Sequence, residues 1–180
     1  MKKRNDIGRT VRRTAVCAIL CALSFVLLLI GAIFEVLDFS VAILASLPIL
    51  FCLAEMGYSY AFLTYGVTTL LGLLLLPGTK FPVLLYALCG GIYPILKKFL
   101  EKIKKPWALI WKVLFVNADA VVVWFLSEWL VPENDQFKNI WMIAFFVGMW
   151  LVFALYDRLL TRTEIMYWRY WRKRLRIKDL

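Results

Sequence analysis

Long apolar stretches alternate with short polar breaks along this chain. The first uninterrupted apolar run covers residues 14–34, which matches the roughly 20 residues that a helix needs to cross the hydrocarbon of a bilayer. Residues 38–97 are too many for one crossing, and polar or turn-forming residues break them near Gly57 and at 77–82. A polar turn at 132–136 divides the last apolar stretch. The pattern predicts an all-α membrane protein with six transmembrane helices, near 14–34, 40–56, 59–76, 82–99, 107–131 and 139–157.

Positive charge orients these helices in the membrane. All but three of the 22 Lys and Arg residues lie in three blocks, at 2–13, 97–105 and 158–178. Short basic loops are retained in the cytoplasm during insertion, so both termini and the middle block are predicted to be cytoplasmic. Because hydrophobic residues make up 63% of the 180 residues and charged residues only 19%, we expect a single integral domain over 1–180. Short loops favour a bacterial plasma membrane.

The basic tail at 163–180 is predicted to form an amphipathic helix. Its aromatic residues Trp168 and Trp171 recur at helical spacing, while Arg169 and Lys173 lie on another face. Such a helix lies in the membrane interface and binds anionic lipid. Docking of a partner protein on this tail is the alternative. Because membrane insertion and lipid already account for the basic blocks, we expect no nucleic-acid partner.

The residue types that most often carry catalysis are missing. The chain contains no histidine, which is the commonest metal ligand and general base. The four cysteines lie inside predicted helices without a C-x-x-C pair, and no nucleotide-binding loop of the Walker type occurs. The sequence therefore predicts no enzymatic activity, no catalytic residue, no metal site and no cofactor. Thiols placed in this way usually serve as small apolar fillers.

Polar residues at membrane depth are the first candidates for solute binding, because they are costly in hydrocarbon and tend to face a cavity or a partner. One face of the fifth predicted helix carries Asn117, Val121, Trp124 and Glu128. This face predicts a pocket wall that opens to the outside. The alternative is that Asn117 hydrogen-bonds a neighbouring helix and Glu128 meets water at the headgroups.

Acidic and aromatic residues near the outer side extend this candidate site. Glu35 and Asp38 are expected in the short first outer loop, beside phenylalanines. Carboxylates with aromatic rings suit a cationic or ring-bearing solute, although an aromatic belt explains many rings at this depth. Tyr86 shares a face of the fourth helix with Gly90 and Tyr93, which fits a pocket wall or ordinary packing. The predicted substrate-binding residues are Glu35, Asp38, Tyr86, Asn117, Trp124 and Glu128.

Small residues predict a surface where another helix docks. The first helix carries Ala15, Ala18 and Ala22, and the spacing from Ala18 to Ala22 is the small-x-x-x-small pattern that lets two helix backbones approach closely. A similar stripe of small residues on the third helix includes Ala61 and Gly72. Some of these stripes must serve packing within the chain.

With these features the chain resembles the substrate-binding S components of energy-coupling factor (ECF) transporters. The resemblance covers the whole length: chain size, six helices, cytoplasmic ends, and an Ala-x-x-x-Ala motif at Ala18 and Ala22. It implies that this motif contacts a transmembrane coupling subunit, which joins two ATPase subunits. It also implies a pocket near the outer side for capture of a vitamin or other micronutrient. This pocket would bring in Glu35, Asp38, Trp124 and Glu128. No substrate-specific motif of the family is matched, so the solute stays open.

One other class of function fits the same features. A polytopic membrane scaffold resembling the cell-shape protein family MreD would have similar length and hydrophobicity, and it would bind cell-wall machinery instead of a solute. The two classes differ in what they bind: a small molecule and an energising complex in the first, a set of structural proteins in the second.

Overall fold

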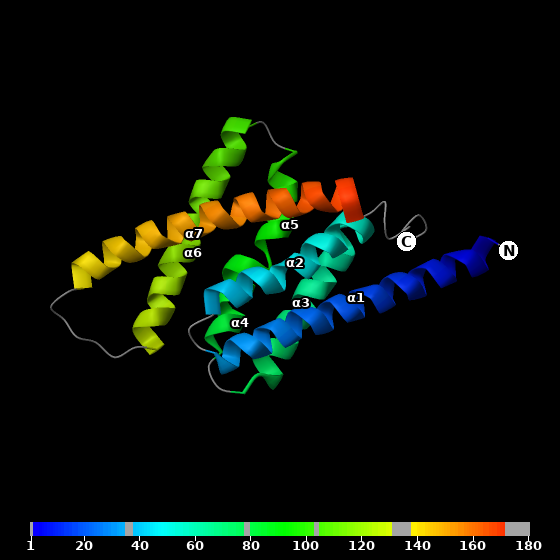
Figure 1. Ribbon diagram of the computed structural model, residues 1–180, viewed down its shortest axis with the longest axis horizontal. Coiled ribbons are helices and arrows are strands. Elements are labelled where there is room, and N and C mark those ends of the chain that lie inside the picture. Colours follow the sequence, from blue (N-terminus) through cyan, green and yellow to red (C-terminus); the bar gives the residue numbers. More distant parts are fainter. Residues whose placement is uncertain (1, 35–37, 78–79, 103–104, 131–137, 172–180) are drawn as a thin grey trace. The chain divides into compact units, whose positions relative to one another are not determined.

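The computed structural model of the chain describes residues 2–34, 38–77, 80–102, 105–130 and 138–171. Within these ranges every regular element is helical and no strand occurs. In chain order the elements are α1 (Lys2–Ile33), α2 (Asp38–Met56), α3 (Tyr58–Leu75), α4 (Phe81–Leu85), the π-helical η2 (Tyr86–Gly90), α5 (Tyr93–Leu100), α6 (Lys105–Leu130), α7 (Lys138–Met166) and the π-helical η4 (Tyr167–Trp171) (Figure 1).

The predicted all-α class is confirmed. With α4, η2 and α5 counted as one interrupted helix, the described ranges contain six helices. Five helices in the same ranges are long and apolar enough to cross a membrane. The chain is therefore a polytopic membrane protein.

Two helices are longer than the sequence predicted. The helix expected at 14–34 begins at Lys2, because no proline interrupts the basic segment and Lys and Arg are good helix formers. The helix expected at 139–157 continues to Met166 and into η4. The predicted tail helix at 163–180 therefore does not begin separately, because α7 continues past residue 163. Residues 172–180 lie outside the described residues. In both cases the hydropathy pattern marked only the apolar part of a longer helix.

The break between α2 and α3 follows the sequence prediction. Gly57 has a φ angle of 90°, a left-handed conformation that residues with a Cβ atom rarely adopt. The helix that follows begins at Tyr58, and α2 ends at Met56. The turn is therefore made by the one residue type that tolerates it.

The fourth predicted helix is interrupted near Gly90, Gly91 and Pro94, because glycine and proline weaken a helix. The chain passes from α4 through η2 and a turn into α5 (Figure 1). A Cβ atom added to Gly90 would meet the carbonyl oxygen of Ala42 at 2.7 Å, and one added to Gly91 would meet the ring of Tyr65 at 2.6 Å. The backbone at this point packs directly against α2 and α3, which only glycine permits.

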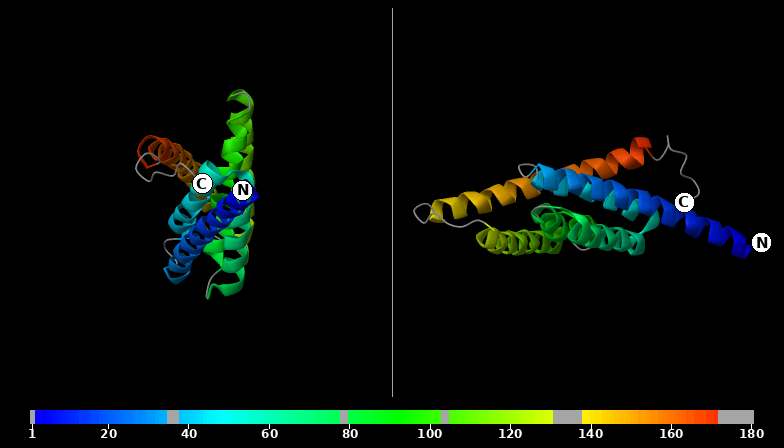
Figure 2. Two further views of the ribbon diagram at one scale, coloured as in Figure 1. Left: turned by 90° about the vertical axis from the view of Figure 1, so that its right-hand side faces the viewer. Right: turned by 90° about the horizontal axis from the view of Figure 1, so that it is seen from below.

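The chain divides into two compact units. The first contains Met1–Lys97 and Arg162–Leu180, and the second contains Lys98–Thr161. In the first unit α1 packs against α2 and α3, and α2 packs against α4 and η2. Figures 1 and 2 show α1 and α2 running side by side. The ring of Tyr167 packs on Phe51, and its hydroxyl donates to the Glu55 carboxylate at 2.7 Å.

The second unit contains α6 and most of α7. Lys112 on α6 donates to the Asp157 carboxylate on α7, with an N–O distance of 3.0 Å. Val116, Ala120 and Val123 form the buried side of α6.

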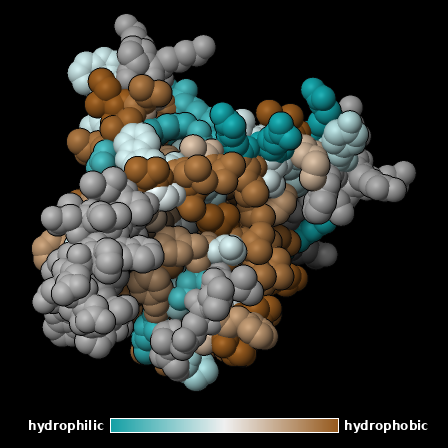
Figure 3. Space-filling model, turned by 60° about the vertical axis from the view of Figure 1, so that its left-hand side comes forward, coloured by the Kyte–Doolittle hydropathy of each residue, from teal (hydrophilic) through white to brown (hydrophobic). Residues whose placement is uncertain are grey.

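Many other apolar side chains of the chain are exposed, and they cover much of the face in Figure 3. Such exposure is expected where a helix faces lipid hydrocarbon.

Candidate functional site

A cluster of polar and sulfur-containing side chains lies buried inside the first unit. Its members come from α1, α2, α3 and η2, and each exposes less than a tenth of its surface. They are Cys17, Cys21, Ser24, Cys52, Thr64, Thr68 and Tyr86. A polar group at this depth is unfavourable unless it has a hydrogen-bond partner. The partners of each hydroxyl therefore indicate what the cluster does.

Two of the hydroxyl groups are satisfied within the protein. Ser24 on α1 donates to the carbonyl of Ala45 on α2 at 2.9 Å, which ties the two helices together. Thr64 donates to the Tyr60 carbonyl one turn earlier in α3, also at 2.9 Å. The Cys52 sulfur lies 3.3 Å from the same Thr64 oxygen. These groups hold the three helices in register.

Two other hydroxyls stand out because they are buried without such partners. The side chains of Tyr86 and Thr68 are both 0% exposed, and no described residue offers either hydroxyl a partner at ordinary hydrogen-bond distance and angle. The Tyr86 hydroxyl lies close to Thr68 and Ser24. A buried polar group left in this state costs about 1–3 kcal/mol. The pair can donate to, and accept from, a small polar group.

The π-helical segment places Tyr86 in this position. Tyr86 is the first residue of η2, and its carbonyl accepts from the Gly91 N–H at 2.6 Å, five residues on. A π-helical turn holds an extra residue and changes which side chains face inward, and such turns occur often at functional sites. Close packing of Gly90 on α2 holds the segment against the core. The tyrosine ring lies beside Tyr65, with 6.1 Å between ring centroids.

The structure describes one of the two acidic residues that the sequence predicts in the first outer loop. Asp38 is the first residue of α2, so its assignment to a loop is wrong. It is 9% exposed, and a carboxylate at a helix N-terminus is stabilised by the helix dipole. Glu35 lies outside the described residues.

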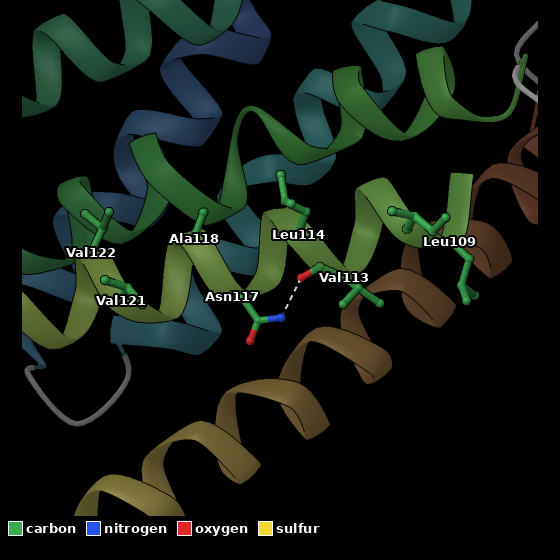
Figure 4. A pocket seen from close by; sticks show the side chains of 8 residues that line it. Leu109, Val113, Leu114, Asn117, Ala118, Val121 and Val122 are labelled. Carbon is green, nitrogen blue, oxygen red and sulfur yellow. Dashed lines mark hydrogen bonds between the residues drawn. The ribbon is translucent and has the colours of Figure 1, made fainter. Parts of the chain in front are cut away.

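The predicted stripe on α6 is only partly a pocket wall. An open hollow of about 720 Å³ follows one side of this helix (Figure 4). Asn117 is the one polar residue among the described residues that line it, which are Leu109, Ile110, Val113, Leu114, Asn117, Ala118, Val121 and Val122. The Asn117 amide donates to the Val113 carbonyl of its own helix at 2.8 Å. Trp124 is half-buried and is not among the lining residues, and the Glu128 side chain lies outside the described residues.

The small residues of the first and third helices differ in how exposed they are. Ala15, Ala18 and Ala22 are exposed on α1, whereas Cys17 and Cys21 face the core. On α3 the corresponding stripe is buried and serves internal packing; it consists of Ala61, Thr64, Thr68 and Gly72. The α1 alanines are thus available to a second protein or to lipid.

Sequence reasoning identified Tyr86 but missed its neighbours. Thr64 and Thr68 belong to the stripe of small residues on the third helix, for which the sequence predicts only packing, and the cysteines are predicted to be apolar fillers. A usable signal was present, because Thr64 and Thr68 are one helical turn apart and both carry a polar group at membrane depth. The predicted residues Tyr86 and Asp38 belong to the first unit, and Asn117, Trp124 and Glu128 to the second.

The polar groups of the buried cluster differ from those of a metal centre. Among the described residues, no three His, Cys, Asp or Glu side chains converge as metal ligands. Instead, the cluster offers hydroxyl groups and an aromatic ring, which can bind and orient a small polar molecule. Comparison of the chain with protein-family models, with curated proteins and with solved structures finds no match.

Proposed function

We propose that this protein is a membrane-embedded substrate-binding subunit for the uptake of a small solute, coupled to a separate energising complex. The solute class implied by the resemblance to ECF S components is a vitamin or other micronutrient. The protein would reside in a bacterial plasma membrane with both termini in the cytoplasm. A transmembrane coupling subunit with ATPase subunits would supply the energy.

The observation that carries this proposal is the pair of buried hydroxyls on Tyr86 and Thr68. Both are fully buried at membrane depth, and neither has a hydrogen-bond partner among the described residues. A packing role alone does not account for them, since Phe and Val would fill the same volume without the penalty of a buried hydroxyl. A polar solute that accepts or donates hydrogen bonds here would offset that penalty.

The exposed alanines on α1 support the coupling half of the proposal. Ala18 and Ala22 are exposed although the opposite side of the same helix is packed in the core. Close approach of a second transmembrane helix needs such small residues. Replacing both with Leu should leave the chain inserted and folded but prevent copurification with a coupling subunit, because bulky side chains hold helix axes apart. Unchanged assembly of the double variant would remove this support.

Native mass spectrometry of the purified protein tests the solute site. We expect a small molecule to copurify with the unmodified chain and to be lost from Tyr86→Phe and from Thr68→Val. Tyr65→Phe is the matched control, because the Tyr65 hydroxyl already donates to the Ala87 carbonyl at 2.8 Å. Equal retention of the molecule by all variants would overturn the site.

The same preparation separates this function from a scaffold. A scaffold of the cell-shape type would copurify with cell-wall proteins and carry no stoichiometric small molecule. In that case Tyr86→Phe would change neither the set of bound proteins nor their amounts. A solute lost on Tyr86→Phe would instead favour uptake.

A further inference from the structure

Three sulfur atoms meet near the end of α2, apart from the hydroxyl pair. Cys17 comes from α1, and Cys52 and Met56 lie one turn apart on α2. The Sγ atoms of Cys17 and Cys52 are 3.2 Å apart, and the Cys17 Sγ lies 3.5 Å from the Met56 Sδ. The two thiols are buried, with exposures of 2% and 0%. No sequence motif predicts this group, because 35 residues separate the two cysteines.

The chemistry of the group selects one class of metal ion. Thiolate and thioether sulfur are soft ligands, and together they favour Cu(I) over hard cations such as Mg²⁺ or Ca²⁺. Zinc sites usually hold four ligands drawn from Cys, His and carboxylates. The chain has no histidine, and no third Cys, Asp or Glu joins the two thiols among the described residues.

The geometry needs only a small adjustment to hold an ion. With metal–sulfur bonds of about 2.3 Å, three sulfurs in a plane around a metal lie about 4 Å from one another. The distances from the Cys17 sulfur to the Cys52 and Met56 sulfurs, now 3.2 Å and 3.5 Å, would therefore lengthen by about 0.5–0.8 Å. A methionine with three rotatable side-chain bonds adapts readily to such a change. No helix has to move by the width of a side chain.

The surroundings of the sulfurs also suit a metal ion. The Thr64 hydroxyl lies 3.3 Å from the Cys52 sulfur. It donates its one proton to the Tyr60 carbonyl, and it can turn away from that carbonyl to donate to a thiolate, as outer partners that fix ligand geometry do. Met56 is the last residue of α2 and is half-buried, so one of the three sulfur ligands is not fully enclosed. A single positive charge bound to one thiolate is neutral overall, as a site at membrane depth requires.

We propose that Cys17, Cys52 and Met56 form a binding site for Cu(I). Binding of one Cu(I) releases one thiol proton, so the ion is held by one thiolate, one neutral thiol and the thioether. Copper stays in the +1 state throughout, so no oxidant or reductant takes part. The site uses neither Tyr86 nor Thr68, and it stands whether or not the proposed uptake function is correct.

The test uses the purified full-length chain in detergent, reduced and handled without oxygen. Cu(I) is supplied as its acetonitrile complex and competed with a chelator whose copper complex absorbs visible light. We expect one Cu(I) per chain to resist the chelator, and X-ray absorption to report sulfur neighbours only. Cys17→Ser and Cys52→Ser should abolish this binding. Met56→Leu, which preserves volume, should weaken it by at least the roughly 10- to 100-fold typical of outer-partner changes.

Matched controls protect the assignment from simple misfolding. Cys21 lies one turn along α1, and its thiol donates to the Thr64 carbonyl at 3.6 Å, so Cys21→Ser should keep its copper. Tyr86→Phe should also keep it, which separates this site from the solute site. Copper retained by Cys17→Ser, or lost equally from Cys21→Ser, would overturn the proposal.

Discussion

Replacing Tyr86 with Phe should stabilise the solute-free protein, contrary to the usual effect of a change in a core. The substitution removes one hydroxyl and keeps the ring, which is fully buried beside Tyr65. That hydroxyl has no hydrogen-bond partner among the described residues, and burying such a group costs about 1–3 kcal/mol. We therefore expect the free energy of unfolding to rise by an amount up to about 1–3 kcal/mol, whereas most core substitutions lower it.

The neighbouring tyrosine provides the comparison. The Tyr65 hydroxyl donates to the Ala87 carbonyl at 2.8 Å, so Tyr65→Phe removes a hydrogen bond that is made. The expected loss is about 0.5–1.5 kcal/mol. The two variants make the same chemical change on touching rings, and the structure predicts opposite signs for them.

Reversible unfolding in mixed detergent micelles measures this difference. The solute-free protein is titrated with a denaturing detergent, and helix content is followed by circular dichroism for the wild type and both variants. Solute binding is measured on the same samples by native mass spectrometry, where Tyr86→Phe should lose affinity although it gains stability. Destabilisation by Tyr86→Phe to the same extent as by Tyr65→Phe would refute the reasoning, since the Tyr86 hydroxyl would then be satisfied in the solute-free protein.

Three further predictions concern packing, charge and topology. Gly90→Ala should lower the free energy of unfolding by about 1–3 kcal/mol, because its Cβ would lie 2.7 Å from the Ala42 carbonyl oxygen, whereas Gly66→Ala, with nothing within 4 Å, should not; the same titration measures both. Asp157→Asn should lower it by about 0.2–1 kcal/mol, because the ion pair with Lys112 is partly exposed, and exchanging the two residues should restore it. Single cysteines in a cysteine-free background should react with an impermeant reagent in intact cells at positions 36, 79 and 134, but not at 6, 103 or 175. Reaction at 103 from outside would overturn the predicted orientation.

The amino-acid sequence by itself determined the elements and the class of this protein. A segment that crosses hydrocarbon must satisfy its backbone internally and be apolar along its length, so composition alone marks each span. The break at Gly57 and the interruption near Gly90 and Gly91 were also readable, because glycine and proline act locally on the backbone. Helix ends were harder to predict, as α1 and α7 show. Polar residues can continue a helix beyond the membrane, so the end of an apolar run does not mark the end of the helix.

Only the tertiary structure decided which side chains meet. In a soluble protein the apolar side of a helix marks its buried face, but a membrane helix is apolar on both its lipid side and its packed side. The sequence therefore could not tell that the alanines of α1 are exposed while Cys17 and Cys21 are buried. The approach of Cys17 to Cys52, and of Tyr86 to Thr68, depends on how each helix is rotated about its axis and on the extra residue in η2. Those rotations follow from contacts between helices, which no single segment contains.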